Sequence, residues 1–191
     1  MIILIRGGSI PAGTGVPKSY VDLLREHYAP FGIEVCNRSN PKETSFDGVE
    51  ALRADIEQIR PEIIILHFGI DDAFSSVYRS EFKENLVQMV RLGRKLPGIE
   101  IILPTSHIFE NPDEMNVMRM YYRVIQEVAS NLDCDFIPVH TYWAAYIQSR
   151  CLSNSAFLQS DVRYPNDRGH NIFAEAFIWK LNRILERNGF F

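Results

Sequence analysis

The run EIIILHFGIDD, residues 62–72, begins as a strand without polar alternation and ends in a glycine turn that carries two carboxylates. Consecutive Ile and Leu residues indicate a strand that is buried on both faces, as is typical of a parallel sheet covered by helices. Four further short apolar runs share this character, at residues 2–5, 33–36, 99–104 and 135–139. The sequence therefore predicts a central sheet of five parallel strands.

Amphipathic segments lie between these runs. After Asp47, apolar side chains recur at helical spacing, and Glu50 stands three residues on as the partner in a capping pair. The clearest helix start is NPDE at residues 111–114, which supplies an Asn cap, Pro at the first helical position and Glu at the third. Further stripes cover residues 82–96 and 173–184. The alternation from end to end predicts a three-layer, doubly wound α/β sandwich.

Length and composition favour one domain, 1–191, because 191 residues with 46% hydrophobic side chains suffice for a single buried core. The net charge is −4 and the charges are interleaved, so we expect no nucleic-acid partner and no membrane surface. MIILI, residues 1–5, is too short for a membrane helix and lacks the basic leader of a secretory signal, which predicts a cytoplasmic protein. Cys36, Cys134 and Cys151 form no CxxC pair, so we expect reduced thiols, no metal and no cofactor.

Three segments place reactive side chains where a doubly wound sheet binds ligands, beyond the carboxyl ends of its strands. RGGSIPAGTG, residues 6–15, puts Ser9 in a glycine turn that lets a substrate approach the backbone, although the same glycines fit a plain tight turn. HFGIDD, residues 67–72, could hold a metal, line a pocket or cap a helix, and capping is the simplest reading. The segment SDVRYPNDRGHNIFAEAF, residues 160–177, contains an Asp and a Pro-Asn turn directly before the predicted last helix.

These segments, with NRSNPKET at residues 37–44, resemble the four motif blocks of the SGNH or GDSL hydrolases and follow in the same order. The resemblance spans nearly the whole chain. It implies a flavodoxin-like strand order 2-1-3-4-5 and, in an active protein, a serine carboxylester hydrolase such as an esterase or O-deacetylase. It also implies that Ser9 stands at the nucleophile position, and that Gly69 and Asp161 are the other functional residues of the family that remain.

Four positions of the family pattern carry other residues. Gly8 replaces the acidic residue before the serine, and Lys42 replaces the glycine whose backbone N–H serves the oxyanion. Asp71 replaces the asparagine oxyanion donor, and Tyr164 replaces the catalytic histidine. A serine hydroxyl needs a base to become a nucleophile, and a phenol with an ordinary pKa of about 10 is protonated at neutral pH. An ionised aspartate only accepts hydrogen bonds and repels a developing oxyanion, unless burial keeps it protonated.

The remaining histidines offer a relocated base. His67, His107 and His140 follow the third, fourth and fifth predicted strands, so all could line one edge of the sheet, or each could bond loop backbone instead. In the implied order, the loops after strands one and four lie about 10 Å apart at their roots. We therefore expect His107 to be the imidazole nearest to Ser9, and His170 to be a structural part of the last helix.

Three hypotheses for function remain open. The first is a divergent hydrolase-fold protein whose pocket, near Lys42, Gly69, Asp71 and Tyr164, binds a small acyl or sugar ester and hydrolyses it weakly or not at all. The second is an active esterase or O-deacetylase that combines Ser9 with a relocated base. The third is a structural or interaction subunit without a ligand. The oligomeric state is left open.

Overall fold

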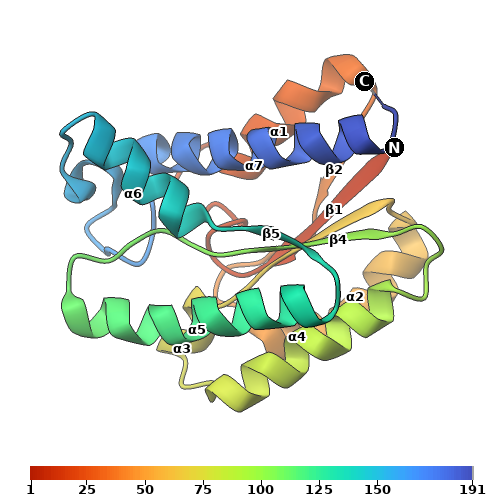
Figure 1. Cartoon of the computed structure of the whole chain (residues 1–191), viewed down its shortest axis with the longest axis horizontal. Coiled ribbons are helices and arrows are strands. Elements are labelled where there is room, and N and C mark those ends of the chain that lie inside the picture. The colour runs from red at the N-terminus through yellow and green to blue at the C-terminus, as the bar shows by residue number, and fades with distance from the viewer. Residues whose placement is uncertain (191) are drawn as a thin grey trace.

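Five parallel strands form one sheet in the computed structural model, which describes residues 1–190 (Figure 1). The strands occur in the order β2-β1-β3-β4-β5, and every neighbouring pair is parallel. This confirms the predicted fold class and strand order. The strand bounds are β1 (Ile2–Gly7), β2 (Glu34–Asn37), β3 (Ile63–His67), β4 (Glu100–Pro104) and β5 (Asp135–Ile137).

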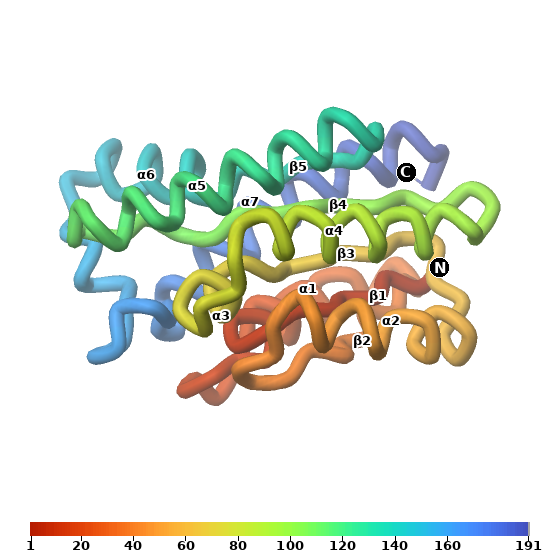
Figure 2. Tube along the Cα trace, turned by 90° about the horizontal axis from the view of Figure 1, so that it is seen from below, coloured from red at the N-terminus to blue at the C-terminus, as the bar shows by residue number. Residues whose placement is uncertain are grey.

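Helices cover both faces of the sheet (Figures 1 and 2). One face carries α1 (Tyr20–Tyr28), α6 (Val139–Ser149) and α7 (Asp167–Arg187). The other carries α2 (Ser45–Ile59), α3 (Ile70–Phe74), α4 (Arg79–Gly93) and α5 (Pro112–Asn131). Two short 3-10 helices, η1 (Ala29–Phe31) and η2 (Asn154–Phe157), complete the set found in residues 1–190. No helix in this described range is long and apolar enough to cross a membrane.

The central strand β3 brings the two glycine turns together. Ile63, Ile64 and Ile65 are 1%, 0% and 0% exposed, and because successive side chains point to opposite faces, both faces of the strand are packed. Gly7, the last residue of β1, lies opposite His67, the last residue of β3. The segments that follow these strands therefore start next to each other at the carboxyl edge of the sheet.

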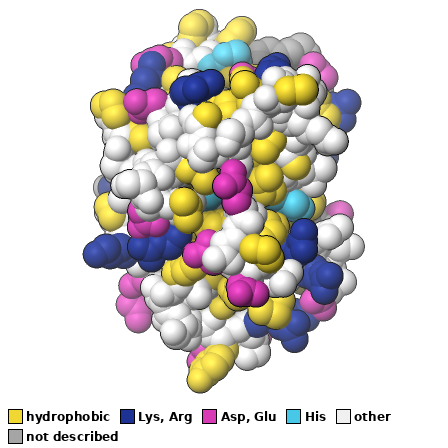
Figure 3. Space-filling view, turned by 90° about the vertical axis from the view of Figure 1, so that its left-hand side faces the viewer, with side chains coloured by type: hydrophobic (Ala, Val, Ile, Leu, Met, Phe, Trp, Pro, Cys, Tyr) yellow, Lys and Arg dark blue, Asp and Glu magenta, His cyan; other side chains and the backbone are white. Residues whose placement is uncertain are grey.

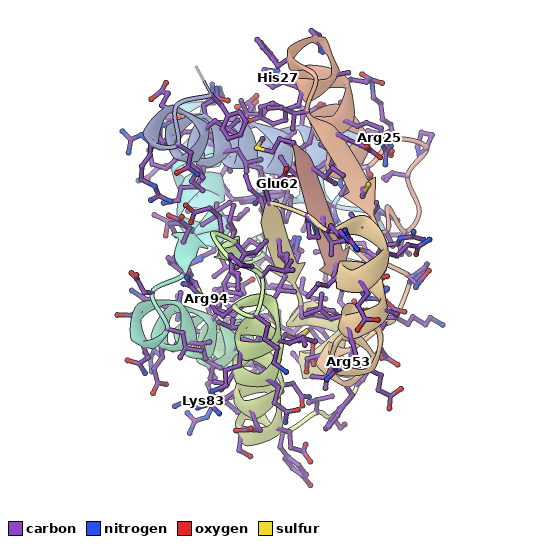
Figure 4. All side chains as sticks on the ribbon, turned by 90° about the vertical axis from the view of Figure 1, so that its right-hand side faces the viewer. Arg25, His27, Arg53, Glu62, Lys83 and Arg94 are labelled. Atoms are coloured by element: carbon purple, nitrogen blue, oxygen red, sulfur yellow. The ribbon has the colours of Figure 1, made fainter. Side chains whose placement is uncertain are left out.

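The two ends of the sheet have different surroundings. Figure 3 shows the end where the strands terminate, and acidic and basic side chains are scattered there among hydrophobic ones. Figure 4 shows the opposite end, where Glu62 accepts a hydrogen bond from the Ile2 N–H (2.6 Å) and Arg94 donates to the Leu132 carbonyl (3.1 Å). These contacts join the starts of β1 and β3 and the ends of α4 and α5, and they leave the carboxyl edge for the candidate site.

Three local predictions need correction. Helix α2 begins at Ser45, before the predicted Asp47, because the Thr44 backbone N–H donates to the Asp47 carboxylate (2.7 Å) and makes Thr44 the cap. The fifth strand ends at Ile137 instead of Val139, because Pro138 lacks an N–H for the sheet and precedes α6. Neither α6 nor the one-turn α3 was among the predicted helices.

The start of α5 tests the capping argument. The Asn111 side chain accepts hydrogen bonds from the Asp113 and Glu114 N–H groups (2.9 and 3.3 Å). We expect Asn111→Ala to lower the free energy of unfolding by about 1 kcal/mol, measured by urea denaturation. Asn131→Ala, at the exposed last residue of the same helix, is the matched control and should change it far less. Equal losses in both variants would contradict the role of Asn111 as the cap.

Candidate functional site

The Ser9 side chain is held by the Asp71 carboxylate. Ser9 Oγ donates to Asp71 Oδ1 (2.7 Å), and the Ser9 backbone N–H donates to Asp71 Oδ2 (2.7 Å). Ser9 itself is 0% exposed and Asp71 is 8% exposed. Each carboxylate oxygen is therefore bonded to a donor of Ser9, and both serine donors are used inside the protein.

Lys42 supplies a third contact, through its backbone. The Lys42 N–H donates to Ser9 Oγ (2.9 Å), so the hydroxyl accepts from Lys42 while it donates to Asp71. Lys42 has φ +66°, in the left-handed region that favours glycine. The loop is fixed by the buried Arg6 of β1, which donates to the Arg38 carbonyl and to Glu43 Oε1 (2.9 Å). A backbone donor thus faces the serine oxygen, although the residue is not glycine.

Gly8 and Asp71 are sterically complementary. A Cβ atom at position 8 would lie 2.1 Å from Asp71 Oδ2 and 2.4 Å from the Glu43 carbonyl oxygen. Any side chain at this position would therefore displace the carboxylate from Ser9. Glycine at position 8 therefore leaves the space that the Asp71 carboxylate fills, and this carboxylate reaches Ser9 from the turn after β3.

The turn after β3 is pinned by Asp72. Asp72 Oδ2 accepts from the Gly69 N–H (3.0 Å), and Oδ1 accepts from the Ser45 N–H at the start of α2 (2.8 Å). Gly69 adopts φ +125°, which a residue with a side chain rarely adopts. The second carboxylate of HFGIDD therefore caps and anchors the turn, and the first one, Asp71, faces Ser9.

Burial raises the pKa of Asp71 above its ordinary value, because the charged form loses its hydration. The two hydrogen bonds from Ser9 and the positive charge of Arg163 act in the opposite direction. The pKa of Asp72 is also raised by burial, against its hydrogen bonds from Ser45 and Gly69. Burial thus destabilises the ionised form of the aspartate beside the serine turn, and the hydrogen bonds from Ser9 stabilise that form.

Asp161 and Tyr164 lie in the loop between η2 and α7. The guanidinium of Arg163 forms an ion pair with the Asp161 carboxylate. Arg163 Nε donates to Asp161 Oδ1 (2.8 Å), and its Nη2 donates to Oδ2 (2.5 Å). This pairing lowers the pKa of Asp161. The guanidinium carbon lies 5.6 Å from the centre of the Tyr164 ring. The acid at this position therefore has a cationic partner two residues away, and a phenol stands where an imidazole was expected.

His107 is buried under the same loop. Its Nε2 lies 3.0 Å from the Val162 carbonyl oxygen, and its Nδ1 lies 3.0 Å from Ser106 Oγ. Because a carbonyl only accepts, Nε2 carries the proton and Nδ1 accepts from the Ser106 hydroxyl. Burial lowers the pKa of His107 to about 4. Within residues 1–190, the hydrogen-bond partners of Ser9 Oγ are Asp71 and Lys42, so a role of His107 as its base stays a prediction.

A second network surrounds Tyr20, which was not among the residues predicted for the site. The Tyr20 hydroxyl lies 2.8 Å from His67 Nδ1, and its backbone N–H donates to His170 Nδ1 (3.0 Å). Burial lowers the pKa of His67 to about 3 and that of His170 to about 4. His140 bonds Thr105 Oγ1 through Nδ1 (2.7 Å). The strand-end histidines are therefore neutral members of internal networks, and His170 is structural, as expected.

The cavity beside the serine turn is very small. Its volume is about 10 Å³, and its lining includes His67, Gly69, Asp71 and Ser106. Such a volume holds about one water molecule. An acyl or sugar ester would reach Ser9 only after the covering loops move.

The raised pKa of Asp71 predicts a specific dependence of stability on pH. Ionisation is penalised in the native state but not in the unfolded chain, where the pKa is about 3.9, so the contribution of Asp71 to the stability of the wild type falls as the pH rises above about 4. We expect the unfolding free energy of Asp71→Asn minus that of wild type to increase between about pH 4 and the native pKa and then level off. Urea denaturation at several pH values measures this difference.

Asp133→Asn is the control, because it removes a surface carboxylate without touching Ser9 and reports the effect of net charge alone. A difference for Asp71→Asn that is constant or decreases with pH would contradict a penalised native carboxylate.

The chain is similar to known esterases. An acetylxylan esterase from Geobacillus stearothermophilus is 26% identical over 181 residues, which cover 88% of this chain and 81% of that protein. Esterase TesA from Pseudomonas aeruginosa is 28% identical over 105 residues, which cover 53% of this chain and 52% of that protein.

Solved structures agree on the fold. The crystal structure of TesA has a TM-score of 0.83 at 21% identity and covers 97% of this chain and 100% of its own. The crystal structure of a catalytic mutant of the acetylxylan esterase has a TM-score of 0.80 at 23% identity and covers 93% of this chain and 92% of its own. The model of the GDSL-like lipase/acylhydrolase family matches residues 5–172, and carboxylic ester hydrolysis is the activity that an active member would have. From this match, which spans most of the sequence, it follows that the chain belongs to the GDSL-like lipase/acylhydrolase family.

Proposed function

We propose that this protein is a divergent member of its family that hydrolyses esters weakly or not at all, because Ser9 is held by Asp71. One observation carries the proposal: the Asp71 carboxylate accepts hydrogen bonds from both the Ser9 N–H and the Ser9 hydroxyl, each at 2.7 Å. A tetrahedral intermediate needs free donors around its oxyanion, each worth roughly 3–4 kcal/mol in the transition state. Here a negative group already uses the Ser9 N–H and would repel the new charge.

Within the described residues, Asp161, Tyr164 and His107 form no hydrogen bond with Ser9 Oγ, which supports the same proposal. Proton abstraction from a serine requires a base within hydrogen-bond reach or one water away. Asp161 is paired with Arg163, and Tyr164 is a phenol. The proton on His107 Nε2 is directed at the Val162 carbonyl, and its free lone pair accepts from Ser106. None of these groups is arranged to take the Ser9 proton.

The ligand class follows from the relatives. They are described as an acetylxylan esterase and an esterase, so a small acyl or sugar ester is the ligand we propose for the Ser9 site. The loop with Gln159 and Val162 contacts the segment after Ser9 and His107: Gln159 Nε2 donates to the Thr14 carbonyl (2.8 Å), and the Val162 carbonyl accepts from His107. This loop would have to open for entry. Protection of the protein against heat by such esters would separate a binding role from that of a subunit without a ligand.

A second candidate is a slow esterase in which Asp71 itself is the base, and the 2.7 Å contact between Ser9 Oγ and Asp71 Oδ1 favours it. As Oγ forms a bond to the acyl carbon, its proton would pass to Oδ1. The neutral carboxyl would no longer repel the oxyanion, and it could return the proton to the leaving alkoxide. Water would then attack the acyl carbon and pass a proton to Asp71, and this proton would return to Ser9 Oγ as the carboxylic acid leaves.

Restoring two family residues tests the first proposal. Tyr164→His alone should do little, because Asp71 still opposes the oxyanion, and Asp71→Asn alone lacks a base. Both together should raise turnover of an activated acetyl ester about tenfold or more above the product of the single effects, since the groups act on one transition state. Steady-state kinetics of the four proteins measure this, and independent effects would contradict the proposed site.

The single variant Asp71→Asn separates the two candidates. If Asp71 blocks the site, wild-type turnover should exceed that of the Ser9→Ala control little or not at all, and Asp71→Asn should not reduce it. If Asp71 is the base, wild-type turnover should exceed that of Ser9→Ala, and Asp71→Asn should abolish the excess. Initial rates on activated acetyl and butyryl esters decide between these results.

A further inference from the structure

A groove between α2 and α4 is much larger than the cavity at Ser9. Its volume is about 340 Å³, against about 10 Å³ beside Asp71. Binding sites for small molecules usually begin at about 300 Å³. The groove lies on the helix layer formed by α2 to α5, away from the turn that holds Ser9.

The floor of the groove is apolar and closely packed. Met89 is 1% exposed, and Val49 and Leu92 are half-buried beside it. Helix α2 approaches this floor at Gly48, where an added Cβ would lie 2.6 Å from the Phe68 ring and 2.8 Å from Met89 Sδ. The floor is therefore fixed by helix packing and presents a short apolar surface.

The rim of the groove is basic. Arg53 comes from α2, and Arg91 and Lys95 come from α4 and the turn after it; all three are exposed. The side chains of these three residues make no hydrogen bond or ion pair with another of the residues 1–190. Glu50 is the one acidic residue in the lining. Arg91 and Lys95 bring two positive charges to the lining of the same groove, and a bound anion would neutralise part of this charge.

Another charged cavity of similar size shows the contrast. It has a volume of about 380 Å³ and is lined partly by Asp135 and Arg187. There the charges neutralise each other, because Arg187 pairs with Asp135 (2.9 Å) and Glu100 (3.1 Å). The lining of the α2/α4 groove carries more positive than negative charge, although the net charge of the whole chain is −4.

We propose that the α2/α4 groove binds a small amphiphilic anion, a phosphate monoester or carboxylate that carries a short alkyl chain. The head group would lie between Arg53, Arg91 and Lys95, and the chain would cover Val49, Met89 and Leu92. The site is separate from Ser9 and does not depend on the function proposed for it.

Isothermal titration calorimetry of the full chain with octyl phosphate tests the proposal. We expect one molecule to bind per chain, and Arg53→Gln or Lys95→Gln to weaken binding about fivefold or more. Lys83→Gln, near the other end of α4 and outside the groove, is the matched control (Figure 4 labels Arg53 and Lys83) and should change binding less than about twofold. Inorganic phosphate and octanol should each bind at least about tenfold more weakly than octyl phosphate.

If Lys83→Gln and Lys95→Gln weaken the binding of octyl phosphate equally, the effect comes from the net charge of the protein alone, and the proposal is overturned. Binding of inorganic phosphate as tight as that of octyl phosphate would remove the role of the apolar floor and overturn it as well. A third experiment measures whether the protein sediments with phosphatidylglycerol vesicles. If it does, if Lys95→Gln abolishes this, and if free octyl phosphate does not bind, then the groove binds a membrane surface and the proposal of a free ligand is contradicted.

Discussion

The hydrogen bonds from Ser9 to the Asp71 carboxylate are the interaction on which the rest of the site depends. They join two segments 62 residues apart and bury an acidic side chain against the serine turn. A buried carboxylate is costly unless its oxygens are bonded, and here both oxygens are. The same bonds use the serine hydroxyl and its N–H inside the protein, and the proposal that this contact keeps the serine from a substrate rests on them.

The surrounding structure makes this contact possible. The parallel pairing of β1 and β3 places Gly7 opposite His67, so the turns that follow start together. Asp72 holds the second turn through Gly69 and Ser45, and glycine at position 8 leaves the space that the Asp71 carboxylate fills. The pairing of β1 with β3 thus brings the polar groups of the serine turn and of the turn after β3 into contact.

Much of this architecture could be predicted because its causes are local. Uninterrupted Ile runs indicated the buried strands, and Asn111 with Pro112 marked the start of α5 correctly. The start of α6 at Val139 was not predicted, because the apolar run at 135–139 continues through Pro138 into the helix. Periodicity alone does not distinguish a short strand from a buried helix. The cap at Thr44 was missed because Asp47 serves as its partner from inside the helix.

The candidate site was predictable in its residues but not in its contacts. Ser9, Lys42 and Asp71 could be named from motif order, whereas the fit of Asp71 into the space above Gly8 depends on distances that no sequence spacing contains. The Tyr20 network with His67 and His170 is likewise made by residues far apart in the chain. A carboxylate in place of an amide was visible in the sequence, and its position against Ser9 was not.

The backbone amide of Ser9 offers the most direct measurement, because it reports the Asp71 contact without any substrate. In a pH titration followed by ¹H–¹⁵N NMR, we expect the Ser9 amide proton to lie downfield at neutral pH, to exchange slowly with solvent and to move upfield as Asp71 is protonated. The movement should follow the pKa of Asp71 and vanish in Asp71→Asn. A Ser9 amide that exchanges rapidly and does not respond to the ionisation of Asp71 would contradict a serine held by this carboxylate.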